Sequence, residues 1–373
     1  MGRSSKDFMS PKPVSIFGRV VMLGMLFALI AVPCFIFYKN VYPLQCLHLS
    51  SQNNDLRDAP SLKLISNPFN FYYSIQLAFN DEQVKLERLL KAATMKDKTV
   101  ILTTLNEAWA APAPNSILDL FLESFKIGEN TKYLLNHCNG PESISALFRS
   151  APRCYALKVE GVDFTVEAYF MKGNYLKMVW SKIDIQKSAL EIGYNFVFTI
   201  YADIMWFRNP FTRFYEDTDF HISTDNYLGN NSYALDNKPN SGFIYVRSNR
   251  RTKKFYKVWY DSRITYPHRH DQAVLMGLIA DSIIREIALT IRFLNTLYFG
   301  GLCEPSKDFN QVCTMHGNCC FGVDNKIHDL NILLDDWRNY KSLSPSVQSS
   351  WKGTWNAPQN CRPKKVMHEE KKY

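Results

Sequence analysis

The sequence predicts an α/β fold, because short apolar, β-branched runs alternate with segments of helical periodicity. Thr99–Thr104 has the composition of a buried parallel strand, and Phe196–Ile200 is a second such run. Between them, apolar residues recur at helical spacing from Asn174, the expected cap, to Gly193, the expected end. An open sheet built in this way binds ligands at the carboxyl ends of its strands.

Other segments extend the same pattern. Asn80 and Gln83 have the spacing of a capping box in front of an apolar helix, and a second helix is expected from Ser116 to Lys126, with Gly128 as its stop. Further strands are expected at Asp219–Thr224 and Gly242–Arg247, and further helices at Asn249–Asp261 and Asp271–Ile279.

The net charge of +9 is concentrated at the two ends of the chain. Basic residues gather in the first 39 residues and again from Arg362 onward, so the long middle section is close to neutral. A nucleic-acid-binding protein needs a concentrated basic face. We therefore expect no nucleic-acid partner, and the 46% of hydrophobic residues are enough for a sizeable core.

An uncharged apolar run, Val20–Tyr38, predicts a membrane anchor. At about 1.5 Å per residue it reaches about 28 Å, close to the thickness of a bilayer core. Basic residues precede it, which places the N-terminus in the cytosol. We expect a cytosolic tail (1–13), a transmembrane anchor (14–38), a luminal stem (39–80) and a luminal globular domain (81–373). A cleaved signal peptide is the alternative, but it would have a shorter apolar region and a small-residue cleavage site.

Cysteine usage favours disulfides. Eight cysteines follow the anchor, an even number that fits an oxidising lumen. In the cytosol, the cluster around His316 would instead indicate zinc. We expect five cysteines to be mostly disulfide-bonded: Cys303, Cys313, Cys319, Cys320 and Cys361. Asn230 begins the sequon Asn-Asn-Ser and is the expected glycosylation site.

Two residues are candidate metal ligands. Asp203 follows the strand Phe196–Ile200, where a carboxylate points into the ligand crevice of an α/β sheet. There it can hold a divalent cation that neutralises a diphosphate leaving group, or it can simply cap the turn before Trp206. His316 can supply an imidazole ligand to the same cation, or it can be a structural histidine.

Two further groups are candidates for contact with a substrate. Asp271 either caps the helix that it opens or hydrogen-bonds sugar hydroxyls, with Gln272 facing the reacting carbon. In Asn240-Ser241-Gly242, the glycine either allows a ligand to approach closely or forms a turn before a strand.

Several longer motifs resemble one known family in the same order. The motifs are Thr103–Trp109, Tyr201–Pro210, Asn240–Gly242, His270–Gln272, Tyr298–Cys303 and Cys313–His316. Between about Glu87 and Leu343, the chain resembles the plant nucleotide-diphospho-sugar transferases, which include the rhamnogalacturonan-II xylosyltransferases and the extensin arabinosyltransferases.

The resemblance implies a fold, a location and a reaction. The fold is GT-A (Rossmann-like), on a single-pass type II anchor in the Golgi membrane. The implied reaction moves a sugar, such as a pentose, from a UDP-sugar donor to a cell-wall polysaccharide or glycoprotein acceptor, with Mn²⁺ and with retention of configuration. The implied roles are metal binding for Asp203 and His316, catalysis for Asp271 and Gln272, and donor binding for Thr104, Asn106, Tyr201, Asn240 and Gly242.

The chain departs from the family pattern in three places. Tyr201 replaces the first acidic residue of an Asp-Ala-Asp motif, and Ala273 replaces an acidic residue after the Asp-Gln pair. The region from Asn136 to Arg153 is short and has no apolar run to form the family's strand. Tyr201 and the short region favour an alternative function, in which a catalytically degenerate member acts as a binding or scaffold partner. A lost exon or a mis-joined gene would explain the short region equally well.

Overall fold

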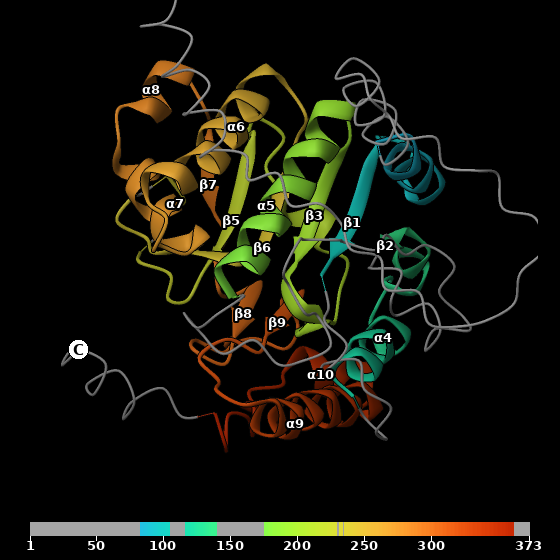
Figure 1. Cartoon of the computed structure of the whole chain (residues 1–373). Coiled ribbons are helices and arrows are strands. Elements are labelled where there is room, and N and C mark those ends of the chain that lie inside the picture. The colour runs from blue at the N-terminus through green and yellow to red at the C-terminus, as the bar shows by residue number, and fades with distance from the viewer. Residues whose placement is uncertain (1–82, 105–115, 140–174, 230, 234, 362–373) are drawn as a thin grey trace, which may run out of the picture. The chain divides into compact units, whose positions relative to one another are not determined.

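The computed structural model describes residues 83–104, 116–139, 175–229, 231–233 and 235–361 (Figure 1). Contacts divide the chain into Met1–Ser66 and Asn67–Tyr373, and all described residues belong to the second unit. The predicted anchor and stem, and the candidate residues Asn106 and Asn230, lie outside the described residues. Within the described ranges, no helix is both long and apolar enough to cross a bilayer.

A six-stranded mixed sheet carries the ligand-binding edge. Its strand order is β2-β1-β3-β6-β5-β7. The strands are β1 (Thr99–Thr103), β2 (Cys138–Asn139), β3 (Asn195–Thr199), β5 (Phe220–Thr224), β6 (Pro239–Val246) and β7 (Ile291–Phe293). β1 is parallel to β2 and β3, whereas β6 is antiparallel to both of its neighbours, β3 and β5.

A second sheet of three short strands has the order β4-β9-β8. It consists of β4 (Ile204–Trp206), β8 (Phe299–Gly301) and β9 (Thr314–His316). β4 is antiparallel to β9, and Ile204 is paired with His316. Since β4 begins directly after Asp203, this pairing brings two distant parts of the sequence together at the end of β3.

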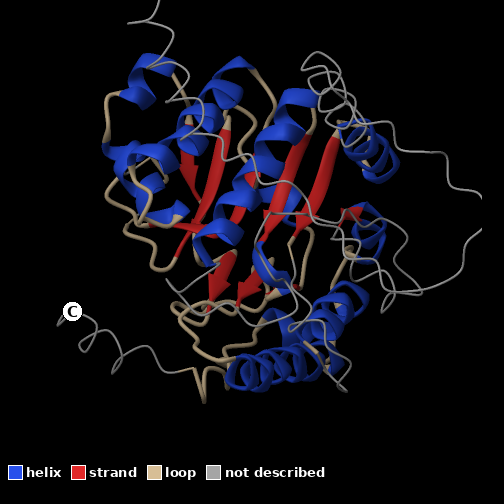
Figure 2. Ribbon diagram, in the orientation of Figure 1, coloured by secondary structure: helices blue, strands red, loops and turns tan. Residues whose placement is uncertain are grey.

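Helices cover the six-stranded sheet through two separate apolar clusters (Figure 2). Along β3, Phe196 and Phe198 belong to one cluster and Val197 to the other, because alternate side chains point to opposite faces. The first cluster includes residues of helix 83–93, α5 (Tyr175–Ile192), α6 (Arg250–Thr265), α7 (Asp271–Ala280) and α8 (Ile283–Ile287). The second includes residues of α4 (Ile117–Ile127), α9 (Val323–Ser342) and the three-stranded sheet; α10 (Pro345–Ser349) follows α9.

The α/β class predicted from the sequence is confirmed, and several helix ends lie at the residues expected to cap them. Ser116 forms a capping box with Asp119 at the start of α4, and Gly128 is its C-cap residue. Asn249 caps α6 through hydrogen bonds from the backbone N–H groups of Arg251 and Thr252. These ends were predictable because short polar side chains satisfy the free N–H groups of a first helical turn.

One expectation about a strand was wrong, and another is tested only at its first residues. The strand expected from Gly242 begins earlier, at Pro239, so the Asn-Ser-Gly sequence lies inside β6 and is not a turn before it. Of the region from Asn136 to Arg153 the structure describes only residues 136–139, where the two-residue strand β2 pairs with Ile101 and Leu102 of β1; the absence of a longer apolar strand stays a prediction. An edge strand this short needs only backbone hydrogen bonds and no apolar run.

Candidate functional site

The antiparallel direction of β6 gathers the candidate residues at one edge of the sheet. β3 and β5 both end at this edge, and β6 begins there, with Phe243 paired to Thr199 and Asn240 to Ser223. Asp203 follows the end of β3 closely, and Asp225 follows the end of β5. The edge is therefore the carboxyl-end crevice in which open α/β sheets bind ligands.

A cleft of about 450 Å³ opens at this edge. Candidate residues from four separate segments line it: Tyr201, Asp203, Asn240, Gly242, Asp271, Gln272 and His316. Residues that the sequence analysis did not single out complete much of the lining, among them Tyr175, Lys182, Asp225, Asn318, Phe321 and Lys326. Its volume is in the usual range for sites that bind a small molecule.

A strained turn carries the chain from β3 to Asp203. Tyr201 and Ala202 both adopt left-handed backbone conformations, with φ angles of 51° and 55°. Such angles cost a residue with a side chain of order 1 kcal/mol or more, and they concentrate at functional sites. Ala202 is fully buried and Asp203 is 1% exposed, while Tyr201 lines the cleft. Burial, together with the nearby Tyr175, Asp271 and Asp203, raises the pKa of Tyr201 above its ordinary value, so the phenol is neutral.

Asp203 lies between a histidine and a lysine. Its Oδ1 is 3.3 Å from Nε2 of His316, and its Oδ2 is 2.7 Å from Nζ of Lys326, which belongs to α9. The backbone N–H of Gly317 donates to the carbonyl oxygen of Asp203 at 2.8 Å, extending the β4–β9 pairing. Burial alone would raise the pKa of Asp203, but the Lys326 ammonium, which also donates a hydrogen bond to Oδ2, and the nearby His316 ring outweigh it and hold that pKa well below the ordinary value.

The Asp203–His316 pair fits a divalent cation. Asp203 Oδ1 is buried and accepts no hydrogen bond from the described residues, and it faces the imidazole Nε2 at 3.3 Å. A carboxylate oxygen and an imidazole nitrogen at this separation can bind one ion side by side, and both donor types suit Mn²⁺. The expected second carboxylate is absent because Tyr201 occupies its position.

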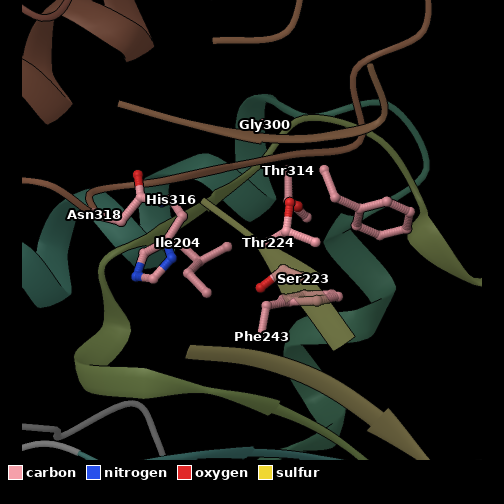
Figure 3. Close-up of a pocket in the computed structure, with 9 residues that line it drawn as sticks. Ile204, Ser223, Thr224, Phe243, Gly300, Thr314, His316 and Asn318 are labelled. Atoms are coloured by element: carbon pink, nitrogen blue, oxygen red, sulfur yellow. The ribbon is translucent and has the colours of Figure 1, made fainter. Parts of the chain in front are cut away.

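The position of His316 depends on Gly242. A Cβ atom on Gly242 would lie 2.4 Å from Cε1 of His316 and 2.9 Å from Cγ2 of Ile200. The glycine therefore does permit a close approach, as expected, but the group that approaches it is the imidazole of the protein itself. On another side of His316 is a small cavity of about 10 Å³, lined also by Thr224 and Asn318 (Figure 3).

Asp225 joins the ends of β5 and β6. Its Oδ1 accepts hydrogen bonds from Nδ2 of Asn240 at 2.6 Å and from Nδ2 of Asn318 at 2.8 Å. The Oδ1 of Asn240 in turn accepts from the backbone N–H of Gly242 at 2.8 Å. Asp225 was not predicted, although its position directly after the strand expected at Asp219–Thr224 matches that of Asp203 after β3.

Asp271 does not cap its helix. His270 is the N-cap residue of α7, and the Asp271 carboxylate pairs with Lys182 of α5 through an Oδ2–Nζ contact of 2.9 Å. Both side chains are almost fully buried, at 2% and 3% exposure. Ser241 Oγ also donates to Asp271 Oδ2 at 3.1 Å, and the Ser241 backbone N–H donates to Oε1 of Gln272 at 3.0 Å. The role of Lys182 could not be predicted from the sequence, because a lysine inside a helix usually indicates an exposed face.

Three predicted site residues are not placed in the cleft. Thr104 follows the end of β1 at the same sheet edge, but it is absent from the cleft lining formed by the described residues. Its buried Oγ1 has no hydrogen-bond partner among those residues. The roles predicted for Asn106 in donor binding and Asn230 in glycosylation remain predictions.

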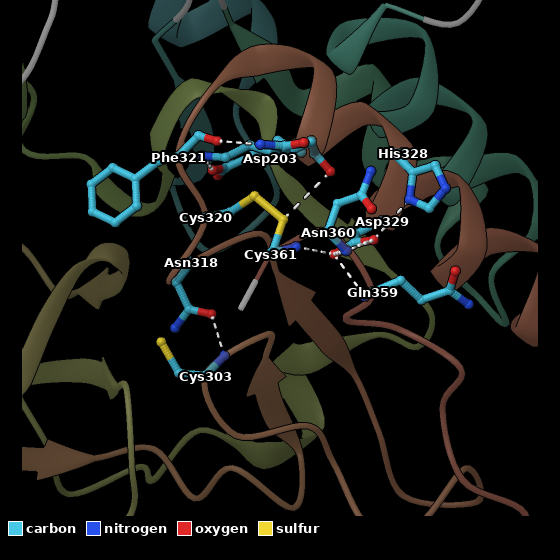
Figure 4. The surroundings of a disulfide bond; sticks show 12 residues. Asp203, Cys303, Asn318, Cys320, Phe321, His328, Asp329, Gln359, Asn360 and Cys361 are labelled. Carbon is cyan, nitrogen blue, oxygen red and sulfur yellow. Dashed lines mark hydrogen bonds and ion pairs between the residues drawn. A yellow bond between two sulfur atoms is a disulfide. The ribbon is translucent and has the colours of Figure 1, made fainter. Parts of the chain in front are cut away.

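Two disulfides lie at the rim of the cleft, and Figure 4 shows the surroundings of one of them, Cys320–Cys361. They join Cys303 to Cys319 and Cys320 to Cys361. Cys313 was expected to be bonded with the others, but it is a buried free thiol, and burial is the main reason that its pKa rises to about 11. Asp225, Cys303 and Cys319 are close enough to surround an ion. The two sulfurs are bonded to each other, however, and thus cannot act as thiolate ligands.

The chain is similar to several known proteins. Residues 142–330 match the family described as nucleotide-diphospho-sugar transferase. A protein of Arabidopsis thaliana, "Uncharacterized protein At4g15970", is 42% identical over 81% of this chain and 83% of its own length. A second from the same plant, "Uncharacterized protein At1g28695", is 34% identical over 70% of this chain and 80% of its own length. A solved glycosyltransferase "involved in the glycosylation of the major capsid of PBCV-1" matches 62% of this chain and 98% of its own, at 11% identity and a TM-score of 0.36.

Proposed function

The chain belongs to the nucleotide-diphospho-sugar transferase family, and we propose that it is a retaining glycosyltransferase that uses a UDP-sugar donor. The acceptor in this proposal is a cell-wall polysaccharide or glycoprotein, and the transferred sugar is of the pentose class. The observation that carries the proposal is the Asp203–His316 pair with its unbonded carboxylate oxygen, in the same cleft as Asp271 and Gln272.

In this proposal, some residues of the cleft bind the diphosphate of the donor and others contact its sugar. Asp203 and His316 would hold Mn²⁺, which, when bound, neutralises charge on the departing diphosphate. Asp271 would accept hydrogen bonds from sugar hydroxyls, since its carboxylate is kept in place by Lys182 and Ser241. Gln272, fixed through Oε1 by the Ser241 backbone, would face the reacting carbon.

A UDP-sugar panel tests the reaction directly. The full-length chain is incubated with UDP-pentoses and UDP-hexoses and with cell-wall acceptors, and release of UDP is measured with and without Mn²⁺. NMR of the product reports the anomeric configuration. We expect retention with one donor of the panel and strong loss of turnover in Asp271→Asn, whereas inversion would contradict the proposed mechanism.

A second candidate function is supported by the position of Tyr201 and the pairing of Asp203 with Lys326. With one acidic residue replaced and the other already paired to a lysine, the chain would bind a sugar nucleotide, or a partner transferase, without turnover. UDP binding without hydrolysis or transfer for any donor of the panel would favour this function over catalysis.

The proposed location is the Golgi membrane, with residues 1–13 in the cytosol and everything beyond Lys39 in the lumen. The basic N-terminal flank beside the apolar run supports this orientation. Protease added to sealed microsomes should remove only the N-terminal tail. Digestion of the main part of the chain would contradict the topology.

A further inference from the structure

Lys326 places a fixed positive charge on the carboxylate that would bind the metal. Its Nζ is 2.7 Å from Asp203 Oδ2, and the opposite oxygen, Oδ1, faces His316. The side chain of Lys326 is 11% exposed and that of Asp203 is 2% exposed, so solvent screens the pair only weakly. A metal ion on Oδ1 and the ammonium on Oδ2 would share one carboxylate.

Contacts around the start of α9 keep the Lys326 ammonium beside Asp203. The Cys320–Cys361 disulfide lies just before the helix (Figure 4). One turn after Lys326, the Asp329 carboxylate accepts hydrogen bonds of 2.7 to 3.1 Å from the backbone N–H groups of residues 359–361. The stem of Lys326 also passes close to Gly317, beside the cleft. The contacts oppose a movement of this end of α9 away from Asp203.

The charges of Asp203 and Lys326 balance before any metal binds, and Asp225 adds one further negative charge to the cleft lining. Asp203 contributes one negative charge and Lys326 one positive charge, while Tyr201 is a phenol that is neutral at pH 7. A divalent cation added alone would leave a net positive charge beside a carboxylate that is only 2% exposed, which is electrostatically unfavourable. A diphosphate bound together with the cation would supply the missing negative charges.

We propose that Lys326 makes metal binding at Asp203 and His316 conditional on the diphosphate of the donor. The inference rests on the proposed function and adds a thermodynamic property to it, namely that metal and nucleotide bind with positive cooperativity. Because coupling between two ligands is reciprocal, UDP raises the affinity for Mn²⁺ by the same factor by which Mn²⁺ raises the affinity for UDP.

The test measures the Mn²⁺ affinity of the full-length chain from the electron paramagnetic resonance signal of free Mn²⁺, with and without UDP. The Lys326 ammonium repels a cation bound on the other oxygen of the same carboxylate, and this repulsion across a few ångströms corresponds, even at the dielectric constant of water, to about 10–100-fold in affinity. Lys326→Met should therefore bind Mn²⁺ about 10–100-fold more tightly than the natural chain when UDP is absent, and its enhancement by UDP should shrink. Lys326→Arg keeps the charge and should keep the coupling.

Two controls make the result specific. Lys254→Met removes an exposed lysine from α6 and should leave both affinities unchanged. Lys326→Gln removes the charge but keeps a hydrogen-bond donor for Asp203, so it replaces the methionine variant if circular dichroism shows that the latter is unfolded. The inference is overturned if the charge-removing variant binds Mn²⁺ no more tightly than the natural chain without UDP. Absence of UDP binding in every folded variant would instead count against the proposed function, and the UDP-free comparison would still decide the role of Lys326.

Discussion

Replacing Lys182 by methionine should destabilise the protein more than any change at an exposed lysine. The substitution keeps a long apolar stem but removes the ammonium 2.9 Å from Asp271, whose side chain is 2% exposed. Removing one partner of a buried ion pair typically costs about 3–5 kcal/mol, because the other charge stays buried without a counter-charge. The Ser241 hydroxyl still donates to Asp271, so we expect about 3 kcal/mol.

Lys187 on the same helix provides the matched control. It pairs with Asp184 at 3.1 Å and Glu191 at 3.7 Å, and both acidic side chains are more than two-fifths exposed. The Lys187 side chain is 18% exposed and its ammonium lies over the Tyr260 ring, but the carboxylates that it would leave unpaired are exposed to solvent, so Lys187→Met should change the free energy of unfolding by only about 1 kcal/mol.

Urea unfolding followed by tryptophan fluorescence measures both variants, since Trp259 hydrogen-bonds the backbone carbonyl of Asp271 at 3.0 Å. The double variant Lys182→Met with Asp271→Asn leaves no unpaired charge and should be more stable than Lys182→Met alone. The reasoning is refuted if Lys182→Met costs no more than Lys187→Met, or if the two substitutions in the double variant are simply additive.

Three further predictions concern local geometry. Gly242→Ala should displace the His316 ring, because the new Cβ would lie 2.4 Å from Cε1. We expect the free energy of unfolding in urea to fall by about 1–3 kcal/mol and Mn²⁺ to bind more weakly. Burial alone would raise the pKa of Asp329, but hydrogen bonds from His328 and three backbone N–H groups lower it. The stabilisation from ionised Asp329 is therefore present above the unfolded pKa of about 3.9 and is lost as pH falls through the folded value. The free energy of unfolding, measured from pH 7 to pH 2, should depend less on pH in Asp329→Asn than in the natural chain. An unchanged pH profile would contradict this. Burial raises the pKa of Cys313 to about 11, so this thiol should resist iodoacetamide at pH 8 in the folded protein. It should react once the chain is unfolded without reductant. Rapid labelling of Cys313 in the folded chain would contradict its burial.

The parts of the site that the sequence could predict are those with a local signal. Asp203 was visible because a carboxylate directly follows a buried strand, and Asp271 and Gln272 because they open a helix. The alternation of strands and helices predicts that the ends of parallel strands share one edge, which accounts for Asp203. Asn240 and Gly242 reach the same edge because β6 is antiparallel, and the alternation does not indicate that direction. Family membership, which the comparisons confirm, supplied the remaining motifs.

The residues that escaped prediction acquire their roles through tertiary contacts. Lys182 and Lys326 are ordinary helix lysines in the sequence, and only the packing of α5 and α9 sets them against Asp271 and Asp203. The free state of Cys313 likewise depends on which sulfurs meet in space, because spacing alone does not fix connectivity. β2 escaped because two residues held by backbone hydrogen bonds leave no hydrophobic pattern.

The measurement that tests the central claim most directly is calorimetric binding of UDP to the full-length chain, with and without Mn²⁺, alongside Tyr201→Asp and Asp203→Ala. We expect the natural chain to bind UDP in a Mn²⁺-dependent manner. Tyr201→Asp, which restores a carboxylate, should tighten binding by about 10–100-fold, and Asp203→Ala should abolish the metal dependence. If the natural chain and Tyr201→Asp are both folded and neither binds UDP with Mn²⁺, the cleft is not a nucleotide-sugar site and the account is contradicted.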